Sequence, residues 1–524
     1  VVAAAPRRPR PEAEARRREL QRAERQAAAA DAARGAVAGT PEDLDLGEGQ
    51  GLSEQVLRQK AKIAELEAAD AAREASTNEE DEEEETDEEE EEDPEEALAR
   101  LLEQVTPCAN SYPVTLVQSA ERQRIQSNGD KWTNVSGLRI MVKPANADDC
   151  VLLVANCMLK PETDKEESHW ALQRGGAKIS PKFATHSRQR NWIHCMCMPY
   201  LDQLEKRMEH DYQVVTNAGG YDSRFEVSPE KQRKQFFAVT VPSYQAAWIE
   251  DDERQAVEPG LWRDLEGMHE VVTTLPGDRV LAICSVRYAA SWASEMNRGR
   301  FTLARDDFGL DGLHDRGLQS VRAMSPGLHR VALMATVDAP PPGPHIYRVR
   351  TALTAGEENG VSNIIQGDRQ LALVRLPAGI VVGPNRVLEP VTVDEGRWTE
   401  IPGLEATITL RRPRDRVMIV YHTDCNPQSY FYEAHFTLFR RSEGSSSAPK
   451  NLGFTEDLGV DMVSSDYAAS SEYPVGIMCD TPGSLGTYTY YVCARVANMG
   501  TSTENPAVTV GYSGTLTLVL FSAR

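Results

Sequence analysis

The stretch Trp132-Thr-Asn-Val135-Ser-Gly137-Leu138 carries the pattern that decides the fold: a Trp followed by an aliphatic residue, a Gly and a Leu. The pattern returns at offsets of 130 and 136 residues, with Leu or Met in the last position. The further copies are Trp262-Arg-Asp-Leu265-Glu-Gly267-Met268 and Trp398-Thr-Glu-Ile401-Pro-Gly403-Leu404. Three of the seven Trp residues of the chain lie in this pattern, which indicates an internal triplication.

Further landmarks follow each copy in the same order. An Asp stands sixteen or seventeen residues after the Trp and opens a short apolar strand, and a later aromatic strand ends in an Arg. A Tyr-x-Val strand and a last apolar strand then close the copy. The landmarks are Asp149, Arg174 and Tyr212; Asp278, Arg305 and Tyr347; and Asp415, Arg440 and Tyr490. Copies two and three also place an Asp before the Tyr, at Asp338 and Asp480, and in copy one we expect Asp211 at this point.

Between the landmarks, short segments of β-branched and aromatic residues alternate with Gly, Pro, Asp and Asn turns, which is typical of strands. The pattern predicts an all-β fold of three tandem β-sandwich modules. We expect each Trp to be a large core anchor and each following Gly to permit a bulge. The repeat landmarks are therefore Trp132, Gly137, Trp262, Gly267, Trp398 and Gly403. The expected boundaries are 107–250, 251–390 and 391–524.

Each repeat resembles the jelly-roll heads of the tumour-necrosis-factor/C1q type and the similar heads at the tips of phage tail fibres. The Trp-to-Gly opening, the middle strand that ends in Arg and the last apolar strand carry this resemblance. The chain has neither a collagen-like Gly-X-Y stalk nor a cysteine pair shared by the repeats. Heads of that kind are usually homotrimers, so the resemblance implies a covalent pseudo-trimer. The alternative is three separate modules joined like beads on a string.

Residues 1–106 differ in composition and predict an arm without a core. Glu79 to Glu96 holds sixteen acidic residues in eighteen positions, which leaves only −7 of the net charge of −23 for the rest of the chain. Such a run cannot bury enough apolar surface to fold alone. We expect a disordered or helical arm that is either a solubilising spacer or a tail for a basic protein partner.

Candidate sites for chemistry are weak. The His194-Cys195-Met196-Cys197 stretch lacks a second cysteine pair at zinc spacing. The acid-rich loop from Asp306 to Asp315 does not match the EF-hand spacing, so it is either a calcium site with oxygen ligands or a plain solvated loop. The segment from Leu201 to Arg207 is interpreted as a surface helix and loop. The sequence therefore predicts no catalytic residues, no metal, no cofactor and free thiols among the nine cysteines.

These observations favour a binding protein that is not an enzyme. The β modules would present loops to a protein or glycan partner; the alternatives are a structural subunit of a larger assembly, or an enzyme with a cryptic site. The mildly acidic body argues against nucleic-acid binding, which needs clustered Lys and Arg. No apolar run is long enough to span a bilayer, and the sequence assigns no compartment.

Overall fold

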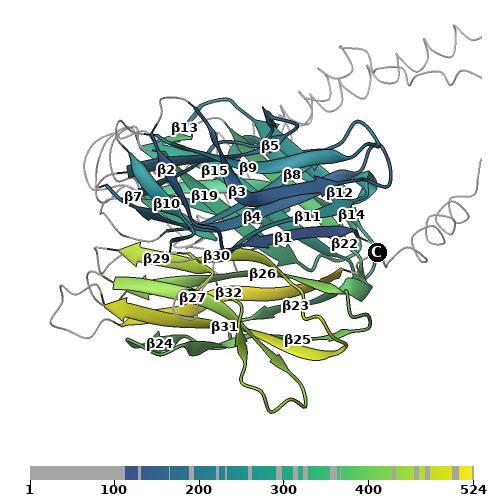
Figure 1. Ribbon diagram of the computed structural model, residues 1–524. Helices are drawn as coiled ribbons and strands as arrows, with labels where there is room; N and C mark the ends of the chain where they lie inside the picture. Colours follow the sequence, from purple (N-terminus) through teal and green to yellow (C-terminus); the bar gives the residue numbers. More distant parts are fainter. Residues whose placement is uncertain are drawn as a thin grey trace, which may run out of the picture. The chain divides into compact units, whose positions relative to one another are not determined.

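The computed structural model shows a body built almost entirely of β-strands (Figure 1). The N-terminal arm, with its acidic run, lies outside the described residues. The described residues are 112–127, 131–163, 166–187, 194–219, 223–229, 233–257, 262–290, 298–310, 317–322, 329–354, 363–365, 368–427, 432–453, 459–465, 473–498 and 507–521.

The strands form three groups, called here modules 1, 2 and 3. Module 1 holds β1 (Val114–Ser119), β2 (Gln123–Gln126), β3 (Thr133–Val142), β4 (Cys150–Pro161), β5 (Glu166–Arg174), β6 (Ala177–Lys178), β7 (Phe183–Ser187), β8 (His194–Gln203), β9 (His210–Ala218), β10 (Arg224–Val227) and β11 (Lys234–Val241). Module 2 holds β12 (Ala246–Asp251), β13 (Gln255–Val257), β14 (Arg263–Thr274), β15 (Arg279–Ala290), β16 (Arg298–Arg305), β17 (Phe308–Gly309), β18 (Gln319–Arg322), β19 (His329–Asp338), β20 (Gly343–Thr354), β21 (Asn363–Ile365) and β22 (Arg369–Leu376). Module 3 holds β23 (Val381–Arg386), β24 (Val391–Val393), β25 (Thr399–Leu410), β26 (Arg416–Pro427), β27 (Tyr432–Ser442), β28 (Lys450–Asn451), β29 (Asp461–Ser465), β30 (Val475–Asp480), β31 (Gly486–Asn498) and β32 (Val508–Phe521).

Each module is a sandwich of two antiparallel sheets with the same strand order. In module 1 the main strands of the inner sheet run β1-β11-β4-β8, with β10 and β2 added beside β4, and the main strands of the outer sheet run β3-β9-β5-β7. Modules 2 and 3 repeat these orders as β12-β22-β15-β19 with β14-β20-β16-β18, and as β23-β32-β26-β30 with β25-β31-β27-β29. The first main strand pairs with the last, and the chain alternates between the sheets, which is the jelly-roll arrangement. The predicted all-β fold of three tandem jelly-roll modules is confirmed.

The links between modules are short and start earlier than the sequence predicted. A single 3-10 turn, η2 (Ser243–Gln245), joins β11 to β12, and η3 (Ala378–Ile380) joins β22 to β23. Because β12 pairs with β22 and β23 pairs with β32, these strands belong to the modules that follow them. The expected module starts at 251 and 391 are therefore late, because the first strands begin at Ala246 and Val381, before each Trp pattern.

The repeated Gly residues lie at irregularities in the outer sheets. The strand register shifts between Asn134 and Arg139, and again at the two equivalent places in modules 2 and 3. Gly137, Gly267 and Gly403 have φ angles of 74°, 73° and 86°, a left-handed backbone that favours glycine. These positions match the bulges that the sequence led us to expect.

The Trp residues are not the core anchors that we expected. Trp132, Trp262 and Trp398 are only half-buried and belong to none of the hydrophobic cores of the modules. The core positions of the pattern are instead the aliphatic residue and the final Leu or Met, which are at most 2% exposed in every copy. Strand alternation is the physical reason, because the Trp and the aliphatic residue are three positions apart and so face opposite sides. The bulge then allows both the aliphatic residue and the final Leu or Met, which are also three positions apart, to face inward.

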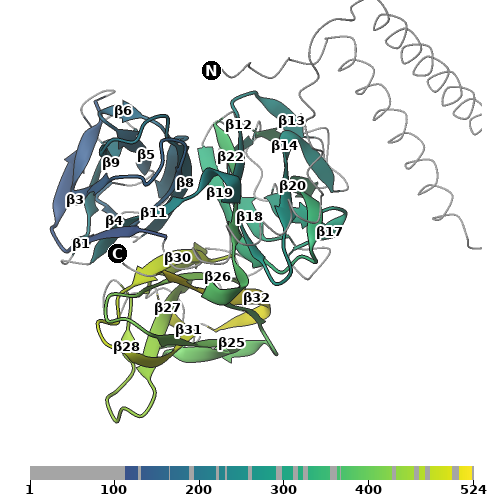
Figure 2. The same cartoon turned by 90° about the vertical axis from the view of Figure 1, so that its right-hand side faces the viewer.

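The inner sheets of the three modules face one another around a common centre (Figure 2). Residues on their inner strands alternate between two environments, as in β4, where Val151 and Leu153 enter the core of module 1. Their neighbours Leu152 and Val154 enter a second cluster, which we call the axial core. The axial core combines residues of all three modules, including Leu281 of module 2 and Val420 of module 3. The body is therefore a covalent pseudo-trimer, and the beads-on-a-string alternative is wrong.

At two of the three interfaces, one side-chain amide bonds both the N–H and the C=O of a single residue in the neighbouring module. Gln370 of module 2 accepts the N–H of Leu201 and donates to the C=O of Leu201, both at 2.9 Å. Gln235 of module 1 makes the same pair of bonds with Cys479 of module 3. The equivalent residue of module 3 is Thr515, whose Oγ1 lies 3.2 Å from Nε2 of the buried His422 instead. The pseudo-threefold arrangement is thus broken in its polar contacts.

Candidate functional site

A buried Arg–Asp–Tyr cluster recurs in every module. The Arg landmark of the middle strand donates to an Asp at the end of the last strand of the inner sheet, and the Tyr hydroxyl donates to the same carboxylate oxygen. The Arg–Asp distances are 2.8, 2.6 and 2.5 Å, and the Tyr–Asp distances are 2.6, 2.9 and 3.0 Å. The members are Arg174, Asp202 and Tyr212; Arg305, Asp338 and Tyr347; and Arg440, Asp480 and Tyr490.

This cluster corrects one assignment made from the sequence. In module 1 the Asp of the cluster is Asp202, whereas Asp211 pairs with Arg139 on the surface at 2.8 Å. The segment expected to be a surface helix from Leu201 to Arg207 instead begins as the end of β8, with Leu201 in the axial core. Burial raises the pKa of Tyr212, Tyr347 and Tyr490, so all three remain hydroxyl donors. Since the cluster is identical in all three modules, we assign it to the scaffold.

The side chains of the other candidates named from the sequence also pack in the cores or form local hydrogen bonds. Cys195 and Cys197 pack against apolar core residues from β8. Asp306 accepts the N–H of Ile346 at 3.0 Å and lies beside His345, while Asp311 and Asp315 lie outside the described residues. Over the part of the chain that the structure describes, no group of His, Cys, Asp and Glu side chains is arranged to hold a metal. Eight cysteines, all but Cys108, are described, and Cys150, Cys157, Cys284, Cys479 and Cys493 are free thiols.

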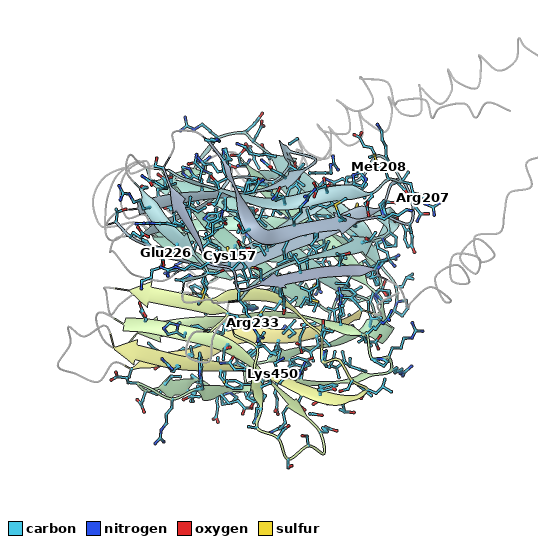
Figure 3. All side chains as sticks on the ribbon, in the orientation of Figure 1. Cys157, Arg207, Met208, Glu226, Arg233 and Lys450 are labelled. Carbon is cyan, nitrogen blue, oxygen red and sulfur yellow. The ribbon has the colours of Figure 1, made fainter. Side chains whose placement is uncertain are left out.

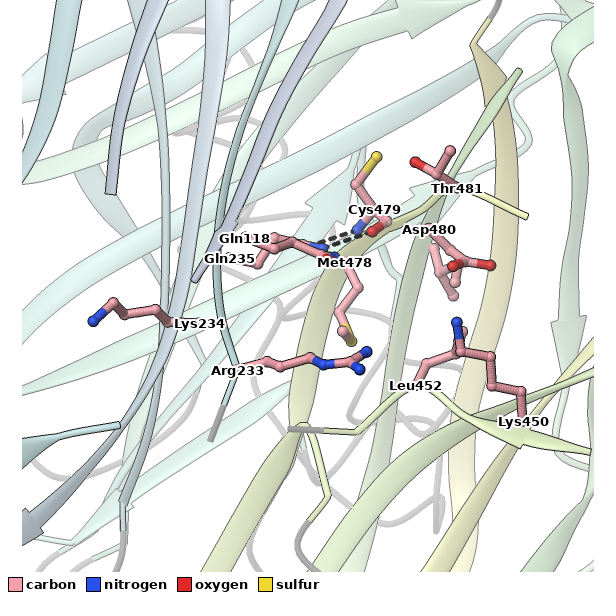
Figure 4. A pocket seen from close by; sticks show the side chains of 11 residues that line it. Gln118, Arg233, Lys234, Gln235, Lys450, Leu452, Met478, Cys479, Asp480 and Thr481 are labelled. Atoms are coloured by element: carbon pink, nitrogen blue, oxygen red, sulfur yellow. Dashed lines mark hydrogen bonds between the residues drawn. The ribbon is translucent and has the colours of Figure 1, made fainter. Parts of the chain in front are cut away.

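One pocket lies between module 1 and module 3, and we call it the module 1–module 3 pocket. Its cavity volume is about 90 Å³, and it is open to solvent. Gln118 and Arg233 line it from module 1, and Lys450, Met478 and Thr481 line it from module 3 (Figure 4). Cys479, which Gln235 holds through its backbone, is part of the wall, so the pocket depends on closure of this interface.

Some charged side chains of the pocket have ion-pair partners among the described residues and others do not. Arg233 and Lys450 are exposed and extend into the pocket from its two walls, and neither forms an ion pair with any of the described residues (Figures 3 and 4). Asp480, by contrast, is engaged by Arg440 and Tyr490. Lys234 points away from the pocket and donates to the C=O of Glu121 (Figure 4). The arrangement leaves two cationic groups available to a ligand.

Both cations are specific to this interface. Gln235 and Gln370 occupy equivalent positions in the strand pairing of modules 1 and 2. Two residues before them lie Arg233 in module 1 and Asp368 in module 2, and Asp368 pairs with Arg287. Lys450 pairs with Arg440 in the β27–β28 hairpin. The residues equivalent to Lys450 are Ala177 in module 1 and Phe308 in module 2. Residues that recur in the three modules build the scaffold, whereas these two differ. Such a difference between copies is what we expect of a functional site in a triplicated fold.

Neither residue stands out in the sequence. Arg233 lies among residues of mixed charge, and Lys450 lies in the short strand β28, far along the chain. Both residues differ from the residues at the equivalent positions of the other modules, so an alignment of the three repeats would reveal them. That alignment needs the strand register, because the hairpin of module 3 between β27 and β28 is longer than its equivalents.

Comparisons with known proteins give fold-level similarities only. No family model matches the chain, and no curated protein matches it. A structure of PNGF-II is 12% identical with a TM-score of 0.21, over 50% of this chain and 64% of that one, so the chain spans less than two thirds of that structure. A triple-jelly-roll protein of an archaeal virus turret is 8% identical with a TM-score of 0.16, over 78% of this chain and 91% of that one.

A tandem CBM22 domain from Paenibacillus barcinonensis is 7% identical with a TM-score of 0.15, over 52% of this chain and 93% of that one. These TM-scores and identities are low, so the jelly-roll assignment rests on the strand pairing. The relation to the tumour-necrosis-factor/C1q type stays a prediction. No helix among the described residues has the length and apolar character needed to span a membrane.

Proposed function

We propose that this chain is a binding protein, not an enzyme, whose pseudo-trimeric body presents a partner site to a glycan or protein. The observation that carries the proposal is the module 1–module 3 pocket, in which Arg233 and Lys450 lack ion-pair partners among the described residues. Charged groups without partners at a concave site are typical of recognition.

The polar groups around the pocket support binding over catalysis. Asp480 is already engaged by Arg440 and Tyr490 and therefore serves as a structural acceptor. Lys234 is turned away, and its pKa is lowered by burial. The lining contains no pairing of a nucleophile with a neighbouring base, the arrangement that covalent catalysis needs.

The experiment is a binding screen with the full chain, using a glycan array and affinity capture from a native extract. We expect saturable binding of a glycan or of a protein at defined stoichiometry, without turnover of the bound molecule. Turnover of a captured glycan or peptide would contradict the proposal, and so would the absence of any saturable partner.

A second candidate is a structural subunit of a larger assembly. The axial core favours it, because the chain buries its threefold contact surface within itself and so forms one closed building block. Sedimentation of the full chain distinguishes the candidates. Ordered particles of fixed size would favour the structural subunit, and a monomer that binds a soluble ligand would favour the binding protein.

A further inference from the structure

We propose that the module 1–module 3 pocket binds an acidic saccharide, a sugar that carries a carboxylate or a sulfate. This inference rests on the proposed binding function and names its ligand class. It starts from Arg233 and Lys450, which line one pocket from two modules and form no ion pair with another described residue.

The two cationic side chains favour a ligand that carries an anionic group. A guanidinium presents a planar fork of N–H donors that matches the two oxygens of a carboxylate or sulfate, and an ammonium adds a second, more flexible charge. The body as a whole is acidic, so this local pair of cations would distinguish an anion at the pocket from anions at other surfaces. Asp480 does not cancel the pair, because Arg440 contacts it at 2.5 Å.

The rest of the lining suits a hydroxylated ring better than a simple ion. The amide of Gln118 and the hydroxyl of Thr481 can donate and accept hydrogen bonds, and Asp480 retains acceptor capacity for a sugar hydroxyl. Leu452 and Met478 supply apolar surface for the C–H face of a pyranose.

The test is a ligand-observed NMR titration of the full chain with four probes: methyl glucuronide, a sulfated glucose, methyl glucoside and acetate. We expect one or both acidic sugars to bind at about 10 mM or below and the neutral sugar and acetate to bind at least tenfold more weakly. Binding should weaken as salt is added, because the recognition is partly electrostatic. Preference for the glucuronide or for the sulfated sugar identifies the acidic group.

Variants place the binding in the pocket. Arg233→Ala and Lys450→Ala should each weaken binding about tenfold or more, and Arg233→Lys should restore part of the loss. Arg207→Ala and Lys206→Ala are matched controls, because these exposed residues lie outside the pocket, with Arg207 far from Arg233 in Figure 3. All four positions are exposed, so unchanged thermal unfolding should confirm that the variants fold.

Three results would overturn the inference. They are equal binding of the neutral and acidic sugars, equal binding of acetate and the acidic sugars, and binding that survives the double substitution of Arg233 and Lys450. Absence of binding by every probe would also overturn it. In that case a protein or neutral glycan captured in the screen above would leave the proposed function standing.

Discussion

The side-chain amide of Gln235 bonds both backbone groups of Cys479, donating to its C=O at 2.7 Å and accepting its N–H at 2.9 Å. The two residues belong to different modules and are 244 positions apart in the chain. A glutamine amide matches a peptide group, so it can complete the hydrogen bonding of a strand edge that lies at an interface. This contact holds one wall of the pocket and joins module 1 to module 3, one of the three interfaces of the pseudo-trimer.

Removing the equivalent amide at the module 1–module 2 interface should destabilise the body. Gln370→Ala leaves the buried N–H and C=O of Leu201 without these partners, and we expect a loss of about 1–3 kcal/mol in the free energy of unfolding. Denaturant unfolding measures it. The exposed Gln118→Ala control should change stability by less than about 0.5 kcal/mol. Equal effects of the two substitutions would contradict a clamping role for Gln370.

The Tyr hydroxyl of the repeated cluster should contribute measurable stability in each module. Tyr490→Phe removes one donor to Asp480 while the ring still fills the core, so we expect a loss of about 1–2 kcal/mol. Tyr212→Phe and Tyr347→Phe should behave alike. Asp211→Asn breaks only the surface pair with Arg139 and should cost at most about 1 kcal/mol. A larger effect of Asp211→Asn than of Tyr212→Phe would restore Asp211 as the cluster residue.

The bulge glycine of module 3 should tolerate no side chain. A Cβ at Gly403 would lie 2.3 Å from the backbone oxygen of Arg386, and its φ of +86° already disfavours other residues. Gly403→Ala should therefore cost about 3 kcal/mol or more. Gly444 is the matched control, because its φ is +71° but an added Cβ would meet nothing within 4 Å. Gly444→Ala should cost only about 1 kcal/mol, so similar losses in thermal unfolding would refute the steric explanation.

The buried His422 should make stability depend on acid pH. Burial, assisted by the positive charge of Arg386, lowers the pKa of His422 to about 4 from 6.5. The unfolded chain therefore binds the proton first, so stability is present above pH 6.5 and falls as the pH drops toward 4. The loss should approach about 3 kcal/mol. His422→Gln should flatten the difference between pH 6.5 and 5 in denaturant unfolding, whereas an unchanged slope would show that another group titrates.

The buried thiols should be inert near neutral pH and should limit stability in alkali. Burial raises the pKa of Cys157 and Cys479 to about 12 from 9.0. Since the folded pKa is the higher one, stability is present below pH 9 and is lost as the pH rises above it. Mass mapping after brief iodoacetamide treatment at neutral pH should find both residues unmodified in the native chain and modified in urea. Rapid native labelling of Cys157 would contradict its burial.

Several parts of the fold could be predicted from local patterns. The Trp-to-Gly pattern and its trailing Asp, Arg and Tyr positions recur at near-constant spacing, and strands with turn residues between them imply a β sandwich. The continuous apolar run Cys150–Val154, and the matching runs after Asp278 and Asp415, also indicate how deeply these strands are buried. Strands buried on only one face alternate, so unbroken runs indicate burial on both faces, as the axial core then shows.

The sequence by itself determined the triplication, the all-β class and the positions of the bulge glycines, because these depend on local spacing and on backbone conformations that few residues adopt. Only the tertiary structure decided that Asp202 replaces Asp211 beside Arg174, that the Trp residues lie outside the cores, and that Arg233 and Lys450 line the same pocket. Each of these depends on strand register and on packing between modules. A shift of one residue in register reverses the face of a strand, so spacing along the chain alone does not determine them.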